Sequence, residues 1–260
     1  GVSTTGIIFD SCKFHDCDEH LIYMSSSDGS TDPTQDAVGP RSAINCQIIN
    51  NEFYNSGMNL TGEAGYYQGY GIHGNSNNTV SVPATAWRQH QQNNLVSGNN
   101  MHDISSGAIL LGGNFGSTAE NNVINNCHSG ILDYYSACEN NVFTNNTIMN
   151  CYYGIRLNYS SFNATIQNNI IVDCTNDYYE DTIPKNPTFI GNIFSDDDIV
   201  SYGYDMSKNH VLTDPELIDI DGNVFIPSLS SSAKNKGTFV NSSIDYYNTD
   251  RIANDIGAVK

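Results

Sequence analysis

Hydrophobic and polar residues alternate along this chain in a pattern that returns every 23 or 24 residues. Four segments read alike, namely NLVSGNNMHDISSGAILL (94–111), AENNVINNCHSGIL (119–132), VFTNNTIMNCYYGIRL (142–157) and TIQNNIIVDC (165–174). One asparagine in each serves as a marker: Asn99, Asn122, Asn146 and Asn169. The same register reaches Asn192 on one side and, on the other, Asn51 and finally Cys12, which holds the marker position in the first repeat.

Apolar residues keep fixed positions relative to the marker. Three residues before it come Phe9, Ile48, Val96, Ala119, Phe143, Ile166 and Phe189, and two residues after it come Phe14, Phe53, Met101, Ile124, Ile148, Ile171 and Phe194. No 3.6-residue period is present, which indicates short strands rather than helices. One repeat cannot bury its own apolar side, whereas coils stacked about 4.8 Å apart form a continuous core. The pattern therefore predicts an all-β, parallel β-solenoid of about seven coils.

The repeats also resemble those of a known family. The motifs N-N-x-I and G-I-x-L are typical of right-handed parallel β-helix proteins of the pectate-lyase-like superfamily (PbH1-type repeats), and the resemblance covers residues 6–194. It implies a single-stranded right-handed β-helix over residues 1–200. Segment 214–259 resembles the closing segments of such proteins, so we expect residues 201–260 to cap the last coil. Lyases, hydrolases, epimerases, tailspikes and adhesins share this scaffold, so the resemblance leaves the activity open.

Asparagine and cysteine both take places in this register. The chain has 35 asparagines among 260 residues, and a stacked turn asparagine bonds to its neighbours above and below and tolerates unusual dihedral angles. Cys127, Cys151 and Cys174 each follow a marker by five residues, as Cys17 follows Cys12. This spacing predicts a stacked column of buried thiols. Seven cysteines without a C-x-x-C pair indicate neither a closed disulfide framework nor a zinc site.

Three insertions interrupt the repeat, at residues 25–42, 57–69 and 77–93. Insertions in a solenoid emerge as loops and are common places for a binding site. The second and third flank the strand candidate YGIHGN (70–75), so we favour one coil that carries both insertions. The alternative makes this segment an extra coil, because Asn51 and Asn99 are two steps of 24 residues apart.

The favoured register makes specific predictions about side-chain direction. Gly71 aligns with Gly107, Gly130 and Gly154, so that Ile72 points inward and His73 outward. On the next two coils the same counting places Ile109 and Leu132 on the outer face. An exposed apolar strip there predicts cover by a loop, a neighbouring domain or a partner in an oligomer.

Residues suited to sugar binding lie on and around the strand candidate. Aromatic rings stack on the apolar faces of sugars, and polar side chains bind their hydroxyl groups. The predicted substrate-binding residues are Tyr66, Tyr67, Tyr70, Trp87, Arg88 and Arg156. The alternative is a tyrosine-rich loop that packs against the flank of the solenoid.

Candidate catalytic residues are fewer. Glycoside hydrolysis needs two carboxyl groups roughly 5–9.5 Å apart, and neighbouring coils of a β-helix supply such separations. Asp103 and Asp133 form the best pair, with His73 as a third catalytic candidate. Alternation places Asp133 on the inward side unless the strand has already ended, and the alternative for the pair is that both are solvated carboxylates in turns. Of the polygalacturonase-like signatures only His73-Gly74 is present, and YGIHGN lacks the acid of an alginate-epimerase-like site.

Charge limits the function further. Twenty-eight acidic residues against 10 basic ones give a net charge of −18, which argues against binding to nucleic acid or to polyanionic glycans. No apolar run reaches the roughly 18–20 residues that span a bilayer. No cofactor is predicted, although Asp28, Asp32 and Asp36 in the first insertion would suit Ca²⁺ without a recognised loop motif.

These observations lead to two hypotheses. The first is a secreted or cell-surface carbohydrate-active β-helix that cleaves or binds a neutral or weakly charged polysaccharide, with a glycoside hydrolase favoured over a polysaccharide lyase. The second is a surface or adhesin-like module in which the β-helix is a spacer. Because terminal solenoid repeats normally carry a cap and the first coil begins without one, we also expect a mature fragment or a domain that continued N-terminally.

Overall fold

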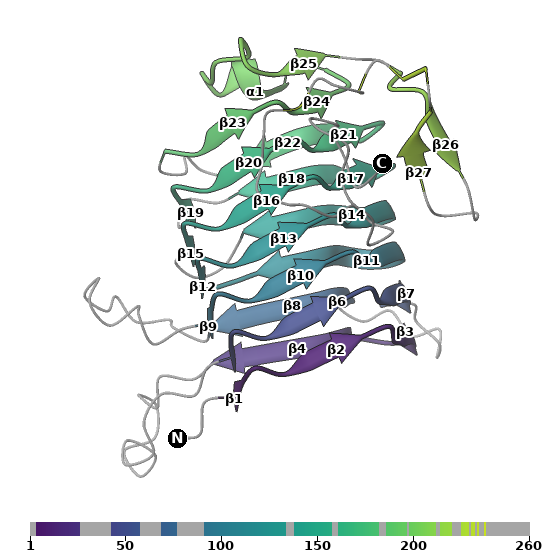
Figure 1. Cartoon of the computed structure of the whole chain (residues 1–260), viewed down its shortest axis with the longest axis vertical. Coiled ribbons are helices and arrows are strands. Elements are labelled where there is room, and N and C mark those ends of the chain that lie inside the picture. The colour runs from purple at the N-terminus through teal and green to yellow at the C-terminus, as the bar shows by residue number, and fades with distance from the viewer. Residues whose placement is uncertain are drawn as a thin grey trace.

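A computed structural model of the chain describes residues 4–26, 43–57, 69–76, 91–133, 138–157, 161–181, 186–196, 198–211, 214–219, 225–228, 230, 231, 233 and 237. Its strands stack into a right-handed parallel β-helix whose coils follow one another along the long axis (Figure 1). The predicted all-β parallel solenoid is therefore confirmed.

Over the described residues, a coil contributes at most one strand to each of two sheets. To a third sheet, which has two parts, it contributes either one long strand or up to two short ones. Within the described residues, the six-stranded sheet contains β1 (Thr4–Thr5), β5 (Ala43–Ile44), β9 (Gln91–Gln92), β12 (Asn114–Phe115), β15 (Cys138–Glu139) and β19 (Ser161–Phe162). The seven-stranded sheet contains β2 (Ile8–Asp10), β6 (Gln47–Ile49), β10 (Leu95–Ser97), β13 (Thr118–Glu120), β16 (Val142–Thr144), β20 (Thr165–Gln167) and β23 (Thr188–Ile190).

The third sheet has twelve strands in the described ranges, eight on its main path and four on branches. Its first part contains β3 (Lys13–Cys17), β7 (Glu52–Ser56), β17 (Thr147–Met149), β21 (Ile170–Val172), β24 (Ile193–Phe194) and β25 (His210–Val211). Its second part contains β4 (His20–Ser26), β8 (Tyr70–Ser76), β18 (Tyr153–Leu157) and β22 (Asn176–Glu180). The long strands β11 (Asn100–Leu111) and β14 (Val123–Asp133) run through both parts.

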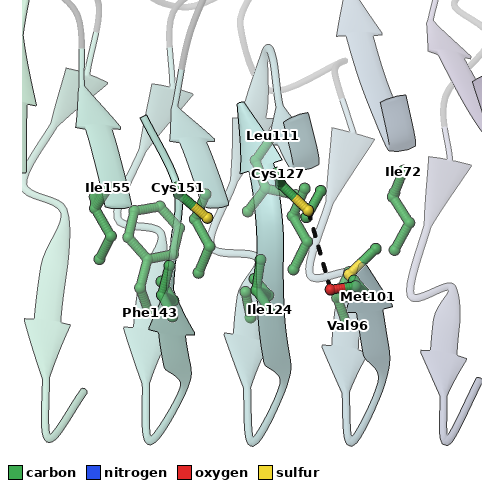
Figure 2. Packing of buried hydrophobic residues seen from close by; sticks show 14 of the residues in the cluster. Ile72, Val96, Met101, Leu111, Ile124, Cys127, Phe143, Cys151 and Ile155 are labelled. Atoms are coloured by element: carbon green, nitrogen blue, oxygen red, sulfur yellow. Dashed lines mark hydrogen bonds between the residues drawn. The ribbon is translucent and has the colours of Figure 1, made fainter. Parts of the chain in front are cut away.

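Both predicted inward columns are confirmed by the strand register. Phe9 aligns with Ile48, and that column continues coil by coil to Phe189. Phe14 aligns with Phe53, and the second column continues to Phe194. Most of these side chains are fully buried and form one continuous cluster along the axis (Figure 2).

The predicted asparagine ladder is also confirmed. The marker side chains from Asn51 to Asn192 are at most 2% exposed, and each Nδ2 donates to the Oδ1 of the marker on the next coil at 2.9–3.1 Å. Asn209 continues the ladder beyond Asn192, only 17 residues on, a member that the 23-residue step does not reveal. The same Nδ2 atoms donate to strand carbonyl groups, so buried amides join the coils.

The thiol column takes the predicted place in the core. Cys127 and Cys151 are buried and point into the same core as Ile124 and Phe143 (Figure 2), and Cys174 is partly buried beside them. All seven cysteines of the chain are free. A hydrogen bond with the Cys151 thiol, and then burial, raise the pKa of Cys174 well above its usual value, as expected for inert core residues.

The segment 43–92 forms one coil, as favoured, and not two. β6 pairs with β2 and β10, β7 pairs with β3 and β11, and β8 pairs with β4 and β11. The stretches 58–68 and 77–90, which lie outside the described residues, are thus insertions into this coil. The insertions are slightly shorter than predicted, because β4 continues to Ser26 and β9 already begins at Gln91.

The described part of residues 201–260 lies in two places. Helix α1 (Asp198–Ser201) buries Ile199 against the C-terminal end of the core, and β25 adds a strand to β24. The antiparallel pair β26 (Leu217–Asp219) and β27 (Phe225–Pro227) lies beside the stack (Figure 1). Leu217 and Ala233 pack there against outward side chains of β17, β21 and β24. None of the helices in the described ranges has the length and apolar character needed to cross a membrane.

Candidate functional site

The outer surface of the second part of the third sheet carries an unusual concentration of rings. We call it the ring face, formed by β4, β8, residues 107–111 of β11, residues 129–133 of β14, β18 and β22. Parallel register stacks its outward residues in two columns. One contains His20, Tyr70, Gly107, Ser129, Tyr153 and Asn176, and the other contains Tyr23, His73, Leu110, Leu132, Arg156 and Tyr179.

Four of these residues form the N-terminal ring cluster: His20, Tyr23, Tyr70 and His73. The His73 ring centroid lies 4.3 Å from that of His20, 4.8 Å from that of Tyr23 and 4.7 Å from that of Tyr70. Tyr23 is 47% exposed, whereas Tyr70 and His73 are buried. The Tyr23 ring is therefore exposed to solvent and packs on the buried rings beneath it.

His73 is the centre of this cluster. Its Nδ1 shares a hydrogen bond of 2.9 Å with Nε2 of His20, and its Nε2 is buried without a hydrogen-bond partner in the described structure. Burial and the nearby His20 lower the pKa of His73 to about 4. His73 is therefore a neutral imidazole near pH 7, with one ring nitrogen that is buried and unpaired in the described structure.

Three coils further along the axis, or roughly 14 Å at about 4.8 Å per coil, lies the C-terminal ring cluster. Its members are His128, Tyr152, Tyr153, Arg156 and Tyr179. His128 stacks on Tyr152 at 5.3 Å, Tyr153 lies 4.6 Å from both Tyr152 and Tyr179, and Arg156 lies over the Tyr153 ring at 5.0 Å. Tyr152 is 48% exposed, so this cluster also offers a ring to solvent.

The apolar residues between the two clusters differ from the prediction. β11 contains one more residue than β14 between Ile104 and Gly107, so Gly107 aligns with Ser129 and not with Gly130. Ile109 therefore points inward and is fully buried in the main core, and Leu110 replaces it beside Leu132. Leu110 and Leu132 are at most 3% exposed and pack with Tyr70. The expected exposed Ile109/Leu132 strip does not exist, and it offers no contact surface for a partner.

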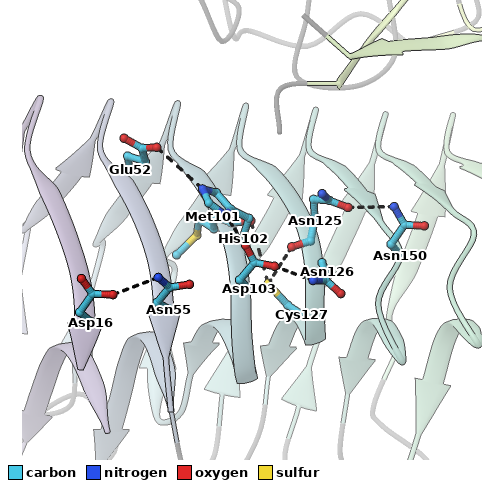
Figure 3. A network of polar contacts seen from close by, with 10 residues as sticks. All are labelled: Asp16, Glu52, Asn55, Met101, His102, Asp103, Asn125, Asn126, Cys127 and Asn150. Atoms are coloured by element: carbon cyan, nitrogen blue, oxygen red, sulfur yellow. Dashed lines mark hydrogen bonds and ion pairs between the residues drawn. The ribbon is translucent and has the colours of Figure 1, made fainter. Parts of the chain in front are cut away.

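Asp103 lies away from the ring face, at a corner of the coil. Its backbone is left-handed (φ 56°), as is that of the other corner residues in its column, Asp16, Asn55, Asn126, Asn150 and Asp173. Figure 3 shows the Asp103 carboxylate between two neighbours, with His102 Nδ1 at 2.8 Å and Asn126 Nδ2 at 2.5 Å. These hydrogen bonds lower the pKa of Asp103 against the opposing effect of burial. Asp103 thus acts as a corner residue of the fold.

Asp133 lies at the end of β14 and points inward. It is 1% exposed, its Oδ1 accepts a hydrogen bond of 3.1 Å from Asn141 Nδ2, and burial raises its pKa to about 6. Asp103 precedes Leu110, the strand partner of Leu132, by seven residues, which places the two carboxyl groups roughly 20 Å apart. A hydrolase pair requires about 5–9.5 Å. The structure therefore does not bring Asp103 and Asp133 together.

The remaining predicted residues divide into two groups. Tyr70, His73 and Arg156 lie on the ring face, whereas Tyr66, Tyr67, Trp87 and Arg88 lie outside the described residues, as do Asp28, Asp32 and Asp36. Over the described ranges, no group of three or more His, Cys, Asp or Glu side chains is arranged to hold a metal ion.

Two members of the N-terminal ring cluster, His20 and Tyr23, are absent from the sequence prediction. The signal is present, because His20-Leu21-Ile22-Tyr23 has the same polarity pattern as Tyr70-Gly71-Ile72-His73, and the two segments pair in register. Counting from the markers alone does not align the two segments, since an insertion lies between Asn51 and Tyr70 and none lies between Cys12 and His20.

Comparison with known proteins agrees with this architecture. A family model described as the right-handed beta helix region matches residues 2–194 and, in a second overlapping match, residues 90–252. Among curated proteins, no sequence is similar enough to count as a match. Since the two matches together span nearly the whole chain, the chain belongs to the right-handed β-helix family.

Proposed function

We propose that this chain is a carbohydrate-active β-helix protein that binds a neutral or weakly charged polysaccharide along the ring face. The observation that carries the proposal is the convergence of one imidazole and two phenol rings, from two neighbouring coils, around the His73 imidazole. Ring faces pack against the apolar C–H surfaces of sugars, while ring nitrogens and phenol oxygens bond to hydroxyl groups. A second pair of rings on the same face, Tyr153 and Tyr179, gives an extended ligand another contact.

Electrostatics favours a neutral ligand. The chain carries a net charge of −18, and His73 stays uncharged near neutral pH because burial lowers its pKa to about 4. A polyuronate would meet long-range repulsion without a compensating imidazolium. A right-handed β-helix with such a ligand belongs outside the cell, where polysaccharides occur, so we place the protein in the secreted or cell-surface class.

Affinity electrophoresis tests this function. Gels containing β-glucan, xylan, galactomannan or polygalacturonate would be run with the wild type, with Tyr23→Ala and with a matched control, Tyr54→Ala. Tyr54 lies in the first part of the sheet, stacked between His15 and His102, so its variant removes a similar ring from outside the ring face. We expect retardation by a neutral polysaccharide, weakened at least about tenfold in Kd by Tyr23→Ala and not by Tyr54→Ala.

Two results would contradict this proposal. Equal retardation of the wild type and Tyr23→Ala would remove the ring face from the binding site. Migration unaffected by every polysaccharide would favour the alternative function, a surface or adhesin-like module that uses the β-helix as a spacer.

Cleavage of the bound polysaccharide is a second candidate function. It is favoured by the neutral His73 imidazole at the centre of the ring cluster, because a neutral imidazole can accept a proton. A hydrolase remains favoured over a lyase, since β-elimination acts on uronates. Assays for new reducing ends and for absorbance near 235 nm separate the two reactions, and His73→Gln should abolish either activity beyond any loss of binding, which the same gels measure in parallel. Absence of products on every polysaccharide that is bound would leave binding as the function.

A further inference from the structure

The C-terminal ring cluster contains Arg156, a positively charged side chain on the ring face. Arg156 is the one lysine or arginine among the described residues of β4, β8, β18, β22 and the ring-face parts of β11 and β14. It is aligned with His73 through Leu132 and Leu110, and thus lies in the same outward column. An extended polysaccharide on the ring face would pass this guanidinium.

The Arg156 guanidinium is held by a carboxylate from the next coil. Its Nε donates to Oδ2 of Asp181 at 3.0 Å, and its second terminal nitrogen donates to Oδ1 at 2.7 Å. Two parallel charge-assisted hydrogen bonds of this kind fix both groups in one plane. The Asp181 backbone is fixed as well, because its N–H donates to the carbonyl oxygen of Leu157.

Two phenol rings restrict the guanidinium further. It lies 5.0 Å from the centroid of the Tyr153 ring and 5.7 Å from that of the Tyr179 ring. The side chains of Arg156 and Asp181 are 20% and 26% exposed, so the pair is partly shielded from water and from salt. A carboxylate of a ligand would therefore compete with an internal carboxylate that is already in the bidentate position.

We propose that Asp181 is a specificity-determining residue, which occupies Arg156 and thereby prevents the ring face from binding polysaccharides that contain uronate. The inference rests on the proposed binding of polysaccharide at this face. A neutral sugar does not need the guanidinium charge, so the Arg156–Asp181 pair leaves its binding intact. A uronate carboxylate needs this cation, because the protein as a whole repels it.

The experiment measures Kd for polygalacturonate and for the neutral polysaccharide that the wild type binds, at low and at high salt. The test variant is Asp181→Asn, with Asp181→Ser as a second variant should the amide disturb the fold. Asp173→Asn serves as the matched control, because this exposed corner residue changes the net charge by the same amount away from the ring face. The double variant Asp181→Asn/Arg156→Gln removes the cation as well.

We expect Asp181→Asn to gain at least about tenfold in affinity for polygalacturonate, with a gain that high salt reduces. Affinity for the neutral polysaccharide should stay within about twofold, Asp173→Asn should gain nothing, and the double variant should lose the gain. Polygalacturonate binding that is unchanged in both Asp181 variants, or that rises equally in Asp173→Asn, would overturn the inference.

These results also separate the inference from the function on which it rests. A wild type that binds a neutral polysaccharide, with Asp181 variants that gain no uronate binding, refutes only the role of Asp181. A wild type that binds no glycan, with Asp181→Asn that binds polygalacturonate, supports the role of Asp181 and refutes the neutral ligand. Absence of binding in every protein refutes both.

Discussion

The buried marker asparagines bond to the coils on both sides of them. Asn146 donates from its backbone N–H and from Nδ2 to Oδ1 of Asn169, both at 2.9 Å, and from Nδ2 to the carbonyl oxygen of Ala119 at 3.0 Å. Its own Oδ1 accepts from the backbone N–H and from Nδ2 of Asn122, at 3.1 and 2.9 Å. A side chain that is fully buried can be polar here because each of its polar atoms has a partner.

Removal of one marker should therefore be costly. Asn146→Ala leaves the backbone N–H of Asn122 and the Ala119 carbonyl group without this buried partner and removes one of the two hydrogen bonds of Asn122 Nδ2. We expect the free energy of unfolding to fall by about 4 kcal/mol. Urea denaturation followed by circular dichroism measures this change. Asn176→Ala is the control, since its amide makes one exposed contact at 3.5 Å and should cost less than about 1 kcal/mol. Equal losses in the two variants would show that the ladder does not stabilise the stack.

Buried carboxyl groups at the C-terminal end of the β-helix make stability depend on pH. Asp177 is fully buried, and its Oδ2 accepts hydrogen bonds from the backbone N–H and Oγ of Ser195 at 2.5 and 2.7 Å. Burial nevertheless raises its pKa to about 7. Because the folded protein holds this proton more tightly than the unfolded chain, the contribution of Asp177 is fully present below about pH 4 and is lost as the pH rises to about 7.

Asp177→Asn removes this titration. Between about pH 4 and pH 8, the free energy of unfolding of the variant should gain up to about 4 kcal/mol relative to that of the wild type, at about 1.4 kcal/mol per pKa unit. Urea denaturation at a series of pH values measures the gain. Ser195→Ala deletes a hydrogen bond to the charged form, so its pH slope should be as steep as that of the wild type or steeper. A slope shared by Asp177→Asn and the wild type would assign the pH dependence to other groups.

At the scale of elements, Gly71, Gly130 and Gly154 share one position of the strand register, where a Cβ would come within 2.7 Å of a backbone carbonyl oxygen of the next coil. A Cβ atom at Gly154 would clash with Cγ2 of Ile171 and lie 2.5 Å from the carbonyl oxygen of Asp177. Gly107, displaced from this column by the extra residue in β11, would instead direct a Cβ to the terminal methyl group of Leu132 and to the Tyr70 ring at 3.2 Å. Backbone cannot move aside at the first position, whereas a leucine side chain can at the second.

This difference predicts unequal effects of the same substitution. Gly154→Ala should lower the free energy of unfolding by about 3 kcal/mol, and Gly107→Ala by about 1 kcal/mol. Thermal and urea denaturation of the two variants compare the positions directly. A larger loss in Gly107→Ala would mean that the register of β11 differs from the one described.

The same elements show what the sequence could predict. The marker and the apolar positions beside it recur at one spacing, so both inward columns and the asparagine ladder follow from counting residues. The extra residue in β11 is not visible in this way, because SSG reads equally well with Gly107 in either register. One residue of shift exchanges the inward and outward sides of a strand, which is why the direction of Ile109 was predicted incorrectly.

The candidate site was predictable only in part for a related reason. His73 and Tyr70 could be placed because Gly71 and Ile72 match the repeat, and Arg156 because it follows Gly154-Ile155. The partners of these residues come from other coils, as with His20 and Asp181, and depend on contacts across insertions and on side-chain direction. Asp103 and Asp133 were chosen for their residue type alone. Asp103 lies at a corner of its coil and Asp133 is buried in the core, so neither lies on a binding surface.

At the scale of the whole molecule, the flanks of the solenoid differ in the side chains that they carry and in what covers them. The hairpin β26–β27 lies over outward apolar residues of β17 and β21, so that flank is packed against the chain itself. The first part of the same sheet, near the N-terminus, carries the stacked column His15, Tyr54 and His102 with their carboxylate partners. Tyr23 is exposed on β4 of the ring face, and Tyr152 is exposed directly before β18, at the edge of this face. A polysaccharide that binds there should therefore leave a footprint that runs along the axis of the β-helix.

Amide hydrogen exchange read by mass spectrometry tests this claim most directly. With and without a saturating neutral polysaccharide, we expect slower exchange in peptides that cover β4, β8 and β18, and unchanged exchange in peptides confined to β3, β7 and β26. The exchange of β3 and β7 serves as the internal control, because these strands belong to the same coils as β4 and β8 but face another flank. Protection confined to β3 and β7, or distributed evenly over both flanks, would contradict binding at the ring face.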